Sequence, residues 1–326
     1  MTENPGSVFF EVNNLRTYFF TREGATKAVD GISFKLREGD ALGLVGESGC
    51  GKSTTALAIM GLVPRPGRTV SGSICLEGID LLQLKEQEFR RNYRWKRISM
   101  VFQGSMNALN PVFKVGDQIT EAIKLHERVS DQQAKSRARE LIELIGIDAD
   151  RADNYTHELS GGMKQRMMIA MALACNPELV IADEPTTALD VIVQAQVLRL
   201  LGDLRQKLRL SMILISHDLS VVAETCNKVA IMYAGKIVEI GDAVQVYTKP
   251  SHPYTQGLMS AFPNLVSEKK ELVSIPGQPP DLRSPPSGCR FHPRCPYVFD
   301  RCRKEEPTYT RTGEGNYAAC WMLNSG

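Results

Sequence analysis

A glycine-rich loop between an apolar run and a helical segment constrains the fold of this chain more than any other feature. Residues 46–54 read Gly-Glu-Ser-Gly-Cys-Gly-Lys-Ser-Thr; they follow the short apolar run 40–45 and precede residues 55–62, which suit a helix. In that setting backbone N–H groups converge on phosphate oxygens, and the helix N-terminus favours negative charge. A turn without chemical meaning is the alternative. The Lys-Ser pair placed after a strand favours an α/β domain that binds a nucleoside triphosphate.

The residue types in this loop match the chemistry of a bound triphosphate. Lys52 can supply a cation to the β- and γ-phosphates, which makes it a candidate catalytic residue, and the Ser53 hydroxyl can ligate Mg²⁺. The candidate nucleotide contacts of the loop are Gly46, Ser48, Gly49, Cys50, Gly51, Lys52, Ser53 and Thr54.

Polar residues follow two further apolar runs that suit buried strands. Residues 179–182 end in Asp183 and Glu184, and His217 follows the run 211–216. An acid at the carboxyl end of such a strand can hold Mg²⁺ through water, and the next carboxylate can polarise an attacking water. A solvated strand end and a structural histidine are the plain alternatives. The placement after buried strands favours Asp183 as a metal ligand, with Glu184 and His217 as catalytic residues.

The chain resembles the ATP-binding-cassette (ABC) ATPase family over about its first 250 residues. Residues 159–166, Leu-Ser-Gly-Gly-Met-Lys-Gln-Arg, are the most specific part of the resemblance, because they are typical of this kind of nucleotide-dependent machine. The motifs that carry the resemblance are, in order, Walker A at 46–54, the Q-loop residue Gln103, the signature at 159–163, Walker B at 179–184, the D-loop at 187–190 and the switch residue His217.

The resemblance implies that two nucleotide-binding domains form a head-to-tail dimer, each ATP lying between one subunit's Walker A and the other's signature. Ser160, Gly161 and Gly162 would then act on the γ-phosphate held by the partner, through a helix N-terminus and backbone N–H groups. Asp190 would contact the partner's Walker A. The resemblance also implies that Gln103 touches Mg²⁺ and the attacking water.

An aromatic residue upstream of Walker A stacks on adenine in this family, and alignment of the strand around Leu15 favours Phe19 for that role. We expect the neighbouring Tyr18 and Phe20 to cover the core of a small β-subdomain. One departure from the family pattern follows Gln103, where many importers have Asp-Pro and this chain has Gly104-Ser105.

The resemblance implies a fold with three parts in the ATPase domain at 1–258: an N-terminal antiparallel β-subdomain, a RecA-like core sheet and an inserted helical subdomain at about 104–165. Residues 115–126 and 130–145 have the pattern of two helices, with Gly146 as a stop. In the family, the helical subdomain receives a short helix of the membrane subunit, which couples closure of the ATP sandwich to the pore.

The remaining residues, 259–326, are expected to form a small Pro- and Cys-rich domain. Residues 247–258 resemble the segment that follows the ATPase domain in oligopeptide and dipeptide importers, and also in relatives that import nickel or glutathione. The stretch 275–288 is too rich in Pro and Gly for a helix or a central strand.

Four of the eight cysteines fall in the last 38 residues, with the spacing C-x₅-C-x₆-C-x₁₇-C. Disulfides are disfavoured without an export signal, and structural zinc usually takes more closely spaced pairs. An iron–sulfur cluster, zinc and unligated thiols all remain open, and the cluster is favoured. Some members of the resembled family carry a [4Fe–4S] centre in this region. The candidate ligands are Cys289, Cys295, Cys302 and Cys320.

Composition limits the possible partners. The net charge of +2 argues against polyanion binding, so no nucleic-acid partner is expected. No apolar stretch approaches the roughly 20 residues that span a bilayer, and the N-terminus lacks the pattern of a secretion signal. The resemblance therefore implies a peripheral subunit on the cytoplasmic face of the inner membrane. Its partners would be a second ATPase subunit, two transmembrane permeases and, indirectly, an extracytoplasmic peptide-binding protein.

Two other functions are alternatives to that of an importer subunit. Soluble ABC proteins usually carry two cassettes, long coiled-coil insertions or a different tail, and none of these features is seen in the sequence. A catalytically silent subunit is disfavoured by the presence of Gln103, Glu184, His217 and the signature.

Overall fold

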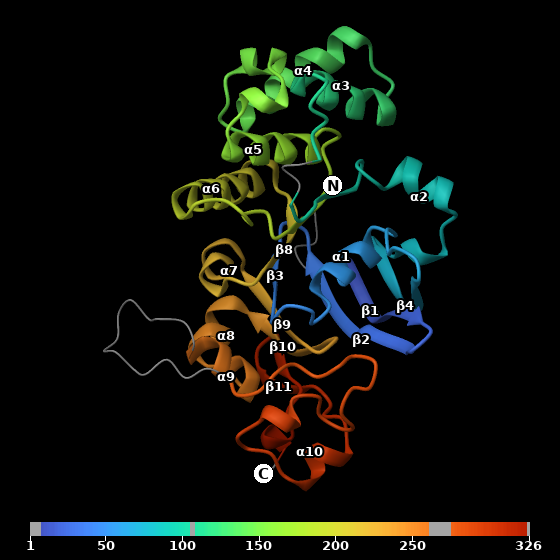
Figure 1. The fold of residues 1–326 in the computed structure, drawn as a ribbon, viewed down its shortest axis with the longest axis vertical. Coiled ribbons are helices and arrows are strands. Elements are labelled where there is room, and N and C mark those ends of the chain that lie inside the picture. Colours follow the sequence, from blue (N-terminus) through green and yellow to red (C-terminus); the bar gives the residue numbers. More distant parts are fainter. Residues whose placement is uncertain (1–7, 105–107, 261–274, 325–326) are drawn as a thin grey trace. The chain divides into compact units, whose positions relative to one another are not determined.

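The computed structural model describes residues 8–104, 108–260 and 275–324 (Figure 1). The chain divides into two compact units. Unit 1 comprises residues 1–36, 41–82 and 216–326, and unit 2 comprises residues 37–40 and 83–215. Two sequence-based expectations, on the first seven residues and on Ser105, lie outside the described residues. Among the described residues, no helix is both long and apolar enough to cross a membrane.

Unit 1 begins with a four-stranded sheet in the order β2-β1-β4-β5, formed by β1 (Val8–Thr21), β2 (Gly24–Arg37), β4 (Gly67–Leu76) and β5 (Ile79–Asp80). Strand β1 runs antiparallel to β4. Phe10, Val12 and Leu15 of β1 are buried and contribute to the apolar core of this sheet. The predicted N-terminal antiparallel β-subdomain is therefore present.

A second set of strands in unit 1 has the order β11-β12-β10-β9-β3. These are β3 (Ala41–Val45), β9 (Lys228–Tyr233), β10 (Lys236–Asp242), β11 (Thr310–Gly313) and β12 (Asn316–Ala318). Strand β3 is parallel to β9 and every one of its residues is buried, as expected for a strand covered on both faces. The last two strands come from the C-terminal segment, and β12 pairs with β10.

The helices of unit 1 are α1 (Lys52–Ile59), α7 (Leu219–Thr225), α8 (Ala243–Thr248), α9 (Pro253–Ser260) and α10 (Asp300–Lys304). A short 3₁₀ turn, Leu81–Gln83, ends the stretch 41–82 and runs into unit 2, and two others occupy His292–Arg294 and Trp321–Asn324 near the C-terminus. Residues 275–288 contain neither helix nor strand, which confirms the prediction from their Pro and Gly content.

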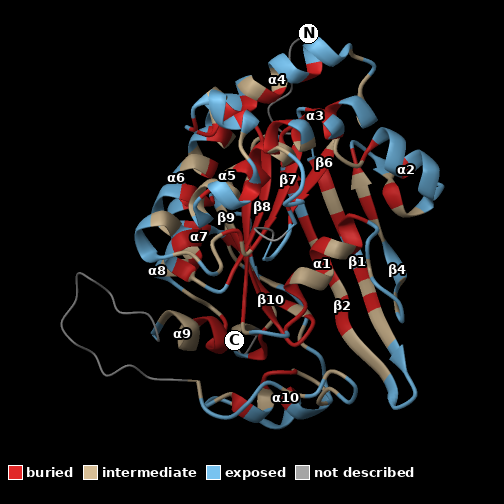
Figure 2. Ribbon diagram, turned by 45° about the horizontal axis from the view of Figure 1, so that its top comes forward, coloured by how far each residue is buried: buried red, intermediate tan, exposed pale blue. Residues whose placement is uncertain are grey.

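Unit 2 contains three parallel strands in the order β8-β7-β6: β6 (Ile98–Val101), β7 (Leu179–Asp183) and β8 (Ser211–Ser216). All of their residues are buried, and Figure 2 shows these strands in red. The longer helices α5 (Gly161–Ala172) and α6 (Val191–Leu208) and the short α2 (Glu86–Asn92) belong to the same unit.

The two helices predicted between Gln103 and the signature are confirmed as α3 (Val115–His126) and α4 (Asp131–Leu144). Ser130 is the N-cap of α4; its hydroxyl accepts from the Gln133 N–H, and the Gln133 side chain accepts from the Ser130 N–H. This reciprocal capping explains why the helix begins there. Helix α3 packs on α4 and on the 3₁₀ segment Ala149–Asp153, and a further turn, Thr156–Glu158, leads to α5.

Candidate nucleotide-binding and catalytic site

The glycine-rich loop connects β3 to α1 and folds around the ammonium group of Lys52. Gly51 is the N-cap of α1 with φ +107°, and a Cβ there would lie 2.1 Å from the Ala28 carbonyl oxygen, so only glycine fits. Lys52 Nζ donates to the carbonyl oxygens of Gly46, at 2.7 Å, and Glu47, at 3.0 Å. The loop thus holds a buried cation at the helix N-terminus, which is the arrangement that receives phosphate.

The other predicted loop residues differ in exposure. Ser48 and Gly49 are exposed, Ser53 and Thr54 are half-buried, and Cys50 is buried with its Sγ 3.8 Å from Lys52 Nζ. The helix begins directly after Gly51, so Ser53 lies in its first turn.

The aromatic residues of β1 have different surroundings. Phe19 is half-buried and lies opposite Gly67 in the β1–β4 pairing. A Cβ added to Gly67 would lie 2.6 Å from Phe19 Cε1, so the ring packs directly on this glycine. Tyr18 donates a 2.6 Å hydrogen bond to Asp30. The expectation that Phe20 covers the core is wrong: the residue is 38% exposed, and the Arg68 guanidinium lies 4.5 Å from its ring centre.

In unit 2, the ends of neighbouring strands bring two candidate catalytic residues together. Gln103 lies just beyond β6 and donates through Nε2 to Glu184 Oε2 at 2.8 Å. Glu184 follows β7, has φ +46°, and its N–H donates to the Ile215 carbonyl. Thr187 also donates to Glu184 Oε2, at 3.0 Å. Asp183 is buried as the last residue of β7, so an acid ends the strand as predicted.

The signature residues form the start of helix α5. Ser160 is the N-cap, and its hydroxyl accepts from the Met163 N–H at 3.3 Å. A Cβ on Gly162 would lie 2.6 Å from the Val193 side chain, so the first turn of α5 packs tightly on α6. Asp190 is the N-cap of α6 and accepts from the Val193 N–H at 3.0 Å. Val193 therefore connects the signature with the predicted D-loop.

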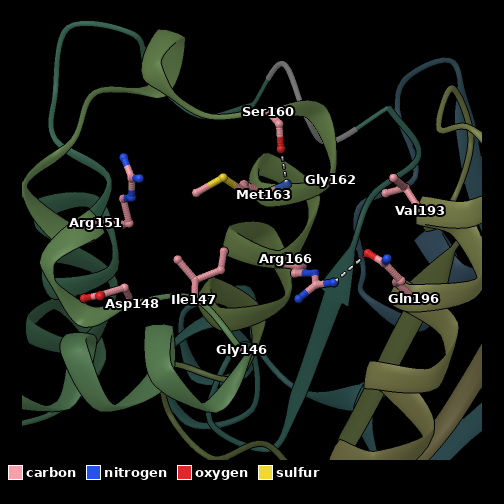
Figure 3. A pocket seen from close by; sticks show the side chains of 10 residues that line it. All are labelled: Gly146, Ile147, Asp148, Arg151, Ser160, Gly162, Met163, Arg166, Val193 and Gln196. Carbon is pink, nitrogen blue, oxygen red and sulfur yellow. Dashed lines mark hydrogen bonds between the residues drawn. The ribbon is translucent and has the colours of Figure 1, made fainter.

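A cavity of about 350 Å³ opens beside the signature, lined by both Ser160 and Gly162 (Figure 3). Its wall includes the basic side chains Arg151 and Arg166 and one acidic side chain, Asp148, and Arg166 donates to Gln196 at 3.0 Å. This places positive charge beside the backbone N–H groups at the start of α5, which suits an anionic ligand.

The remaining candidates divide between the units. Walker A, Phe19 and His217 belong to unit 1, whereas Gln103, Asp183, Glu184, the signature and Asp190 belong to unit 2. His217 directly follows β8, as the sequence predicted, and its side chain is exposed.

The four C-terminal cysteines line a single pocket in unit 1, together with apolar residues that include Phe291 and Trp321. Burial raises the pKa of the Cys289 thiol to about 12 and also raises those of Cys295 and Cys320. Among the residues that the structure describes, no group of three or more His, Cys, Asp or Glu is placed to hold a metal ion.

Two important contacts had no signal in the sequence. Thr187 belongs to the predicted D-loop with no role of its own, yet it donates to Glu184. Glu47 is not among the predicted nucleotide contacts, yet it forms an ion pair with Arg294 at 2.7 Å. The pair lies 247 residues apart in the chain, so no local pattern could have indicated it.

Three features are typical of an ATPase of the ABC type. They are the glycine-rich loop around Lys52, the strand β7 that ends in Asp183, and the Ser-Gly-Gly sequence at the start of α5. Residues 29–187 match the family model described as "ABC transporter". A solved dimeric structure of the ATP-binding cassette MJ0796, bound to ADP and phosphate, is similar with a TM-score of 0.64 and 25% identity, covering 72% of this chain and 98% of that one. The predicted ABC ATPase fold is confirmed.

Relatives that match almost the full length of the chain show which group of ABC ATPases it belongs to. The dipeptide transport ATP-binding protein DppD of Escherichia coli is 47% identical, with 95% of each chain covered. The oligopeptide transport ATP-binding protein OppD of Bacillus subtilis is 48% identical, covering 96% of this chain and 88% of its own. Residues 238–302 match the model "Oligopeptide/dipeptide transporter, C-terminal region". The chain belongs to the family of ATP-binding subunits of peptide ABC transporters, whose ATP hydrolysis is coupled to transport.

Proposed function

We propose that this chain binds MgATP at residues 46–54 and hydrolyses it to drive import of di- or oligopeptides through partner permeases. The observation that carries the catalytic part is the hydrogen bond from Gln103 to Glu184, because it pairs the predicted metal- and water-contacting amide with the predicted base. The cargo class follows from relatives that transport dipeptides and oligopeptides.

The proposed reaction is in-line attack of water on the γ-phosphate. Lys52 and the loop N–H groups would offset the phosphate charge, and Ser53, Gln103 and Asp183 are the residues that would hold Mg²⁺, which would offset further charge. Glu184 is the base or water-orienting group. His217 contacts the γ-phosphate, and Phe19 stacks on adenine.

We further propose that the two ATP sites form in a head-to-tail dimer with a second ATPase subunit. Ser160, Gly161 and Gly162 would complete the partner's site, and Asp190 would contact the partner's Walker A. Two features support this: the cavity beside Ser160 is lined by two arginines and one aspartate, and Val191 and Ile192, next to Asp190, are 80% and 73% exposed. Such apolar exposure is typical of a surface that another protein covers.

In the assembled importer, residues 1–258 would be the ATPase domain, and its helical subdomain, about 104–165, would receive the membrane subunits. The chain would lie on the cytoplasmic face of the inner membrane, with two permeases and, indirectly, an extracytoplasmic peptide-binding protein as partners. Residues 259–326 would form the C-terminal domain of the peptide importers.

For the cysteines we propose a [4Fe–4S] cluster with a structural role. The observation that fits is the convergence of Cys289, Cys295, Cys302 and Cys320 on one apolar pocket. Burial raises the pKa values of the Cys289, Cys295 and Cys320 thiols, so these three are neutral unless a metal group replaces their protons. When bound, the cluster would cross-link a segment with little apolar core of its own.

The test is to purify the chain with its co-expressed membrane subunits and to measure peptide-stimulated ATP hydrolysis in liposomes. Co-purification with permeases and a rate that rises with peptide and binding protein support the proposal. Failure to co-purify with the permeases, together with an ATP hydrolysis rate that does not change with peptide, would contradict the proposal.

A further inference from the structure

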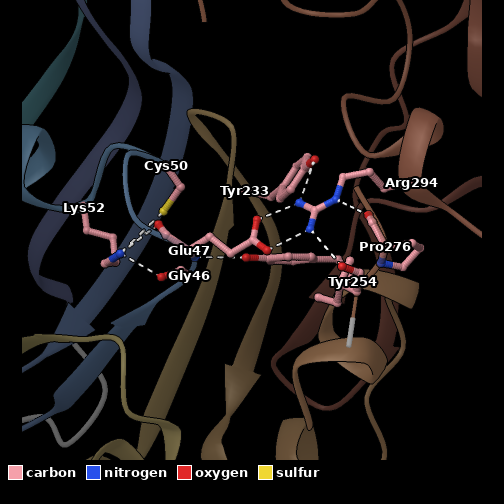
Figure 4. Close-up of polar contacts among 9 residues, drawn as sticks. Gly46, Glu47, Cys50, Lys52, Tyr233, Tyr254, Pro276 and Arg294 are labelled. Atoms are coloured by element: carbon pink, nitrogen blue, oxygen red, sulfur yellow. Dashed lines mark hydrogen bonds and ion pairs between the residues drawn. The ribbon is translucent and has the colours of Figure 1, made fainter. Parts of the chain in front are cut away.

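An arginine of the cysteine segment reaches the phosphate-binding loop. Arg294 directly precedes Cys295, and its side chain is only 5% exposed. Its two terminal nitrogens donate to the two oxygens of Glu47, at 2.7 and 2.9 Å (Figure 4). This paired geometry fixes the direction of both side chains, as a single point contact would not.

Glu47 is held at three points, all of which bear on the loop. Its carboxylate meets Arg294, its N–H donates to the Tyr254 hydroxyl at 3.0 Å, and its carbonyl accepts from Lys52 Nζ at 3.0 Å. Tyr254 is fully buried, so this anchor belongs to the core. A single residue therefore connects the arginine beside Cys295 with the lysine proposed to meet the phosphates.

Arg294 is itself fixed by the segment that carries it. Its Nε donates to the Pro276 carbonyl at 2.8 Å, and its guanidinium lies 5.7 Å from the ring centre of Tyr233. These contacts hold the cation in place before any ligand binds. The position of Glu47 thus depends on the packing of residues far beyond the ATPase motifs.

The pair also has an electrostatic consequence. Glu47 is the second residue of a loop that is proposed to bind a triphosphate, so an uncompensated carboxylate there would repel the ligand. The interaction between charges is strong where water is partly excluded. The Arg294 guanidinium offsets this negative charge while it fixes the loop.

A second arginine makes a similar connection to the strand that carries Phe19. Arg290 directly follows Cys289, forms an ion pair with Asp30 and donates to the Ala234 carbonyl. Asp30 in turn accepts from Tyr18, the neighbour of Phe19. The cysteine segment is therefore joined to both proposed ends of the nucleotide site, the phosphate end and the adenine end.

We propose that Arg294 and Arg290 are positioning residues through which the cysteine segment sets the ATP affinity of this subunit. The inference rests on the proposed binding of ATP at residues 46–54. Arg294 holds and neutralises Glu47 in the phosphate loop, and Arg290 holds the strand of Phe19 through Asp30. Neither arginine touches the reacting atoms, so each acts on affinity and not directly on the chemical step.

The experiment measures the affinity of the full-length chain for a fluorescent ATP analogue, with the variants Arg294→Gln, Glu47→Gln and the double variant. Arg294→Gln is expected to weaken binding about tenfold, because it leaves an unpaired carboxylate beside the phosphate site. The double variant removes that carboxylate and should recover several-fold of the loss. Arg283→Gln is the matched control, since Arg283 also pairs with acids but at the exposed surface, and it should bind like the wild type.

Three further readouts keep the outcome decisive. In the assembled transporter, Arg294→Gln should raise KM for ATP and leave kcat nearly unchanged. Arg294→Lys keeps the positive charge but cannot donate two parallel hydrogen bonds to Glu47. Its affinity for the ATP analogue should lie between those of the wild type and Arg294→Gln. Arg290→Gln should weaken binding in the same direction. If Arg294→Gln does not fold, the ATP affinities of Arg294→Lys and Arg290→Gln test the inference instead, after thermal unfolding has shown that both variants are folded.

Wild-type affinity in folded Arg294→Gln, or a double variant no better than the single one, would overturn the inference. The second result would mean that Arg294 only stabilises the segment. Failure of the wild-type chain to bind the analogue would instead contradict the proposed function, so the two failures are distinguishable.

Discussion

The side-chain amide of Gln103 donates a 2.8 Å hydrogen bond to the carboxylate of Glu184, and the two residues follow adjacent parallel strands, β6 and β7. Thr187 donates to the same carboxylate oxygen. The left-handed backbone of Glu184 turns the chain sharply at the strand end, a conformation that is uncommon for residues other than glycine and often found at functional sites. The carboxylate is therefore oriented by its surroundings.

Glu184→Gln is expected to bind ATP with near-normal affinity and to lose turnover by about 100-fold or more, because general bases contribute about 10²–10⁴-fold. The amide keeps the size of the side chain but cannot take a proton. Steady-state ATPase rates and ATP binding of the assembled transporter measure the two effects. Glu178→Gln, just before the other end of β7, removes a carboxylate that pairs with Arg97 and should keep most of the activity. Rapid hydrolysis by Glu184→Gln would reject the assignment.

Gly162→Ala is expected to destabilise unit 2, because its Cβ would lie 2.6 Å from the Val193 side chain. Overpacking of this kind costs about 1–3 kcal/mol of unfolding free energy. Urea unfolding of the variant measures the loss. Adding Val193→Ala makes room and should restore stability.

The same pair separates packing from function at the signature. If Gly162 also approaches the partner's nucleotide, the double variant will be stable yet slow in ATP turnover. Gly202→Ala, in the middle of α6, is the control, since the added Cβ would meet no atom within 4 Å from the described residues outside its own stretch of helix. It should be neutral or slightly stabilising. A Gly162→Ala protein as stable as the wild type would contradict the packing argument.

Because the four cysteines line one pocket, the loss of any one of them should impair binding of the proposed iron–sulfur cluster. Cys302→Ser, at a buried position of α10, should lower the iron and acid-labile sulfide of anaerobically purified protein and increase protease cleavage of the C-terminal segment. Cys75→Ser, at a half-buried cysteine of β4, is the matched control and should keep the wild-type iron content. Wild-type protein without iron and sulfide would contradict the cluster.

The sequence predicted the features whose cause is local. The helices at Val115–His126 and Asp131–Leu144 follow from apolar periodicity and a capping serine, and the loop at 46–54 from its glycines and lysine. The features it did not predict depend on residues distant in the chain. The pairing of β12 with β10 and the ion pair of Arg294 with Glu47 both join the C-terminal segment to the ATPase strands. Phe20 was misplaced because β1 is long enough for its end to leave the core.

The buried imidazole of His252 predicts how stability depends on pH. The residue is 1% exposed, its Nδ1 accepts from the Tyr254 N–H at 3.0 Å, and burial lowers its pKa from 6.5 to about 3. Between those pH values the unfolded chain binds a proton that the folded chain does not. This residue should therefore cost about 1.4 kcal/mol of unfolding free energy for each pH unit below 6.5. His252→Asn, whose amide oxygen can accept from the same N–H, should flatten that slope in urea titrations between pH 7.5 and about 5.5. Equal slopes for the two proteins would show that the histidine is not held neutral in the fold.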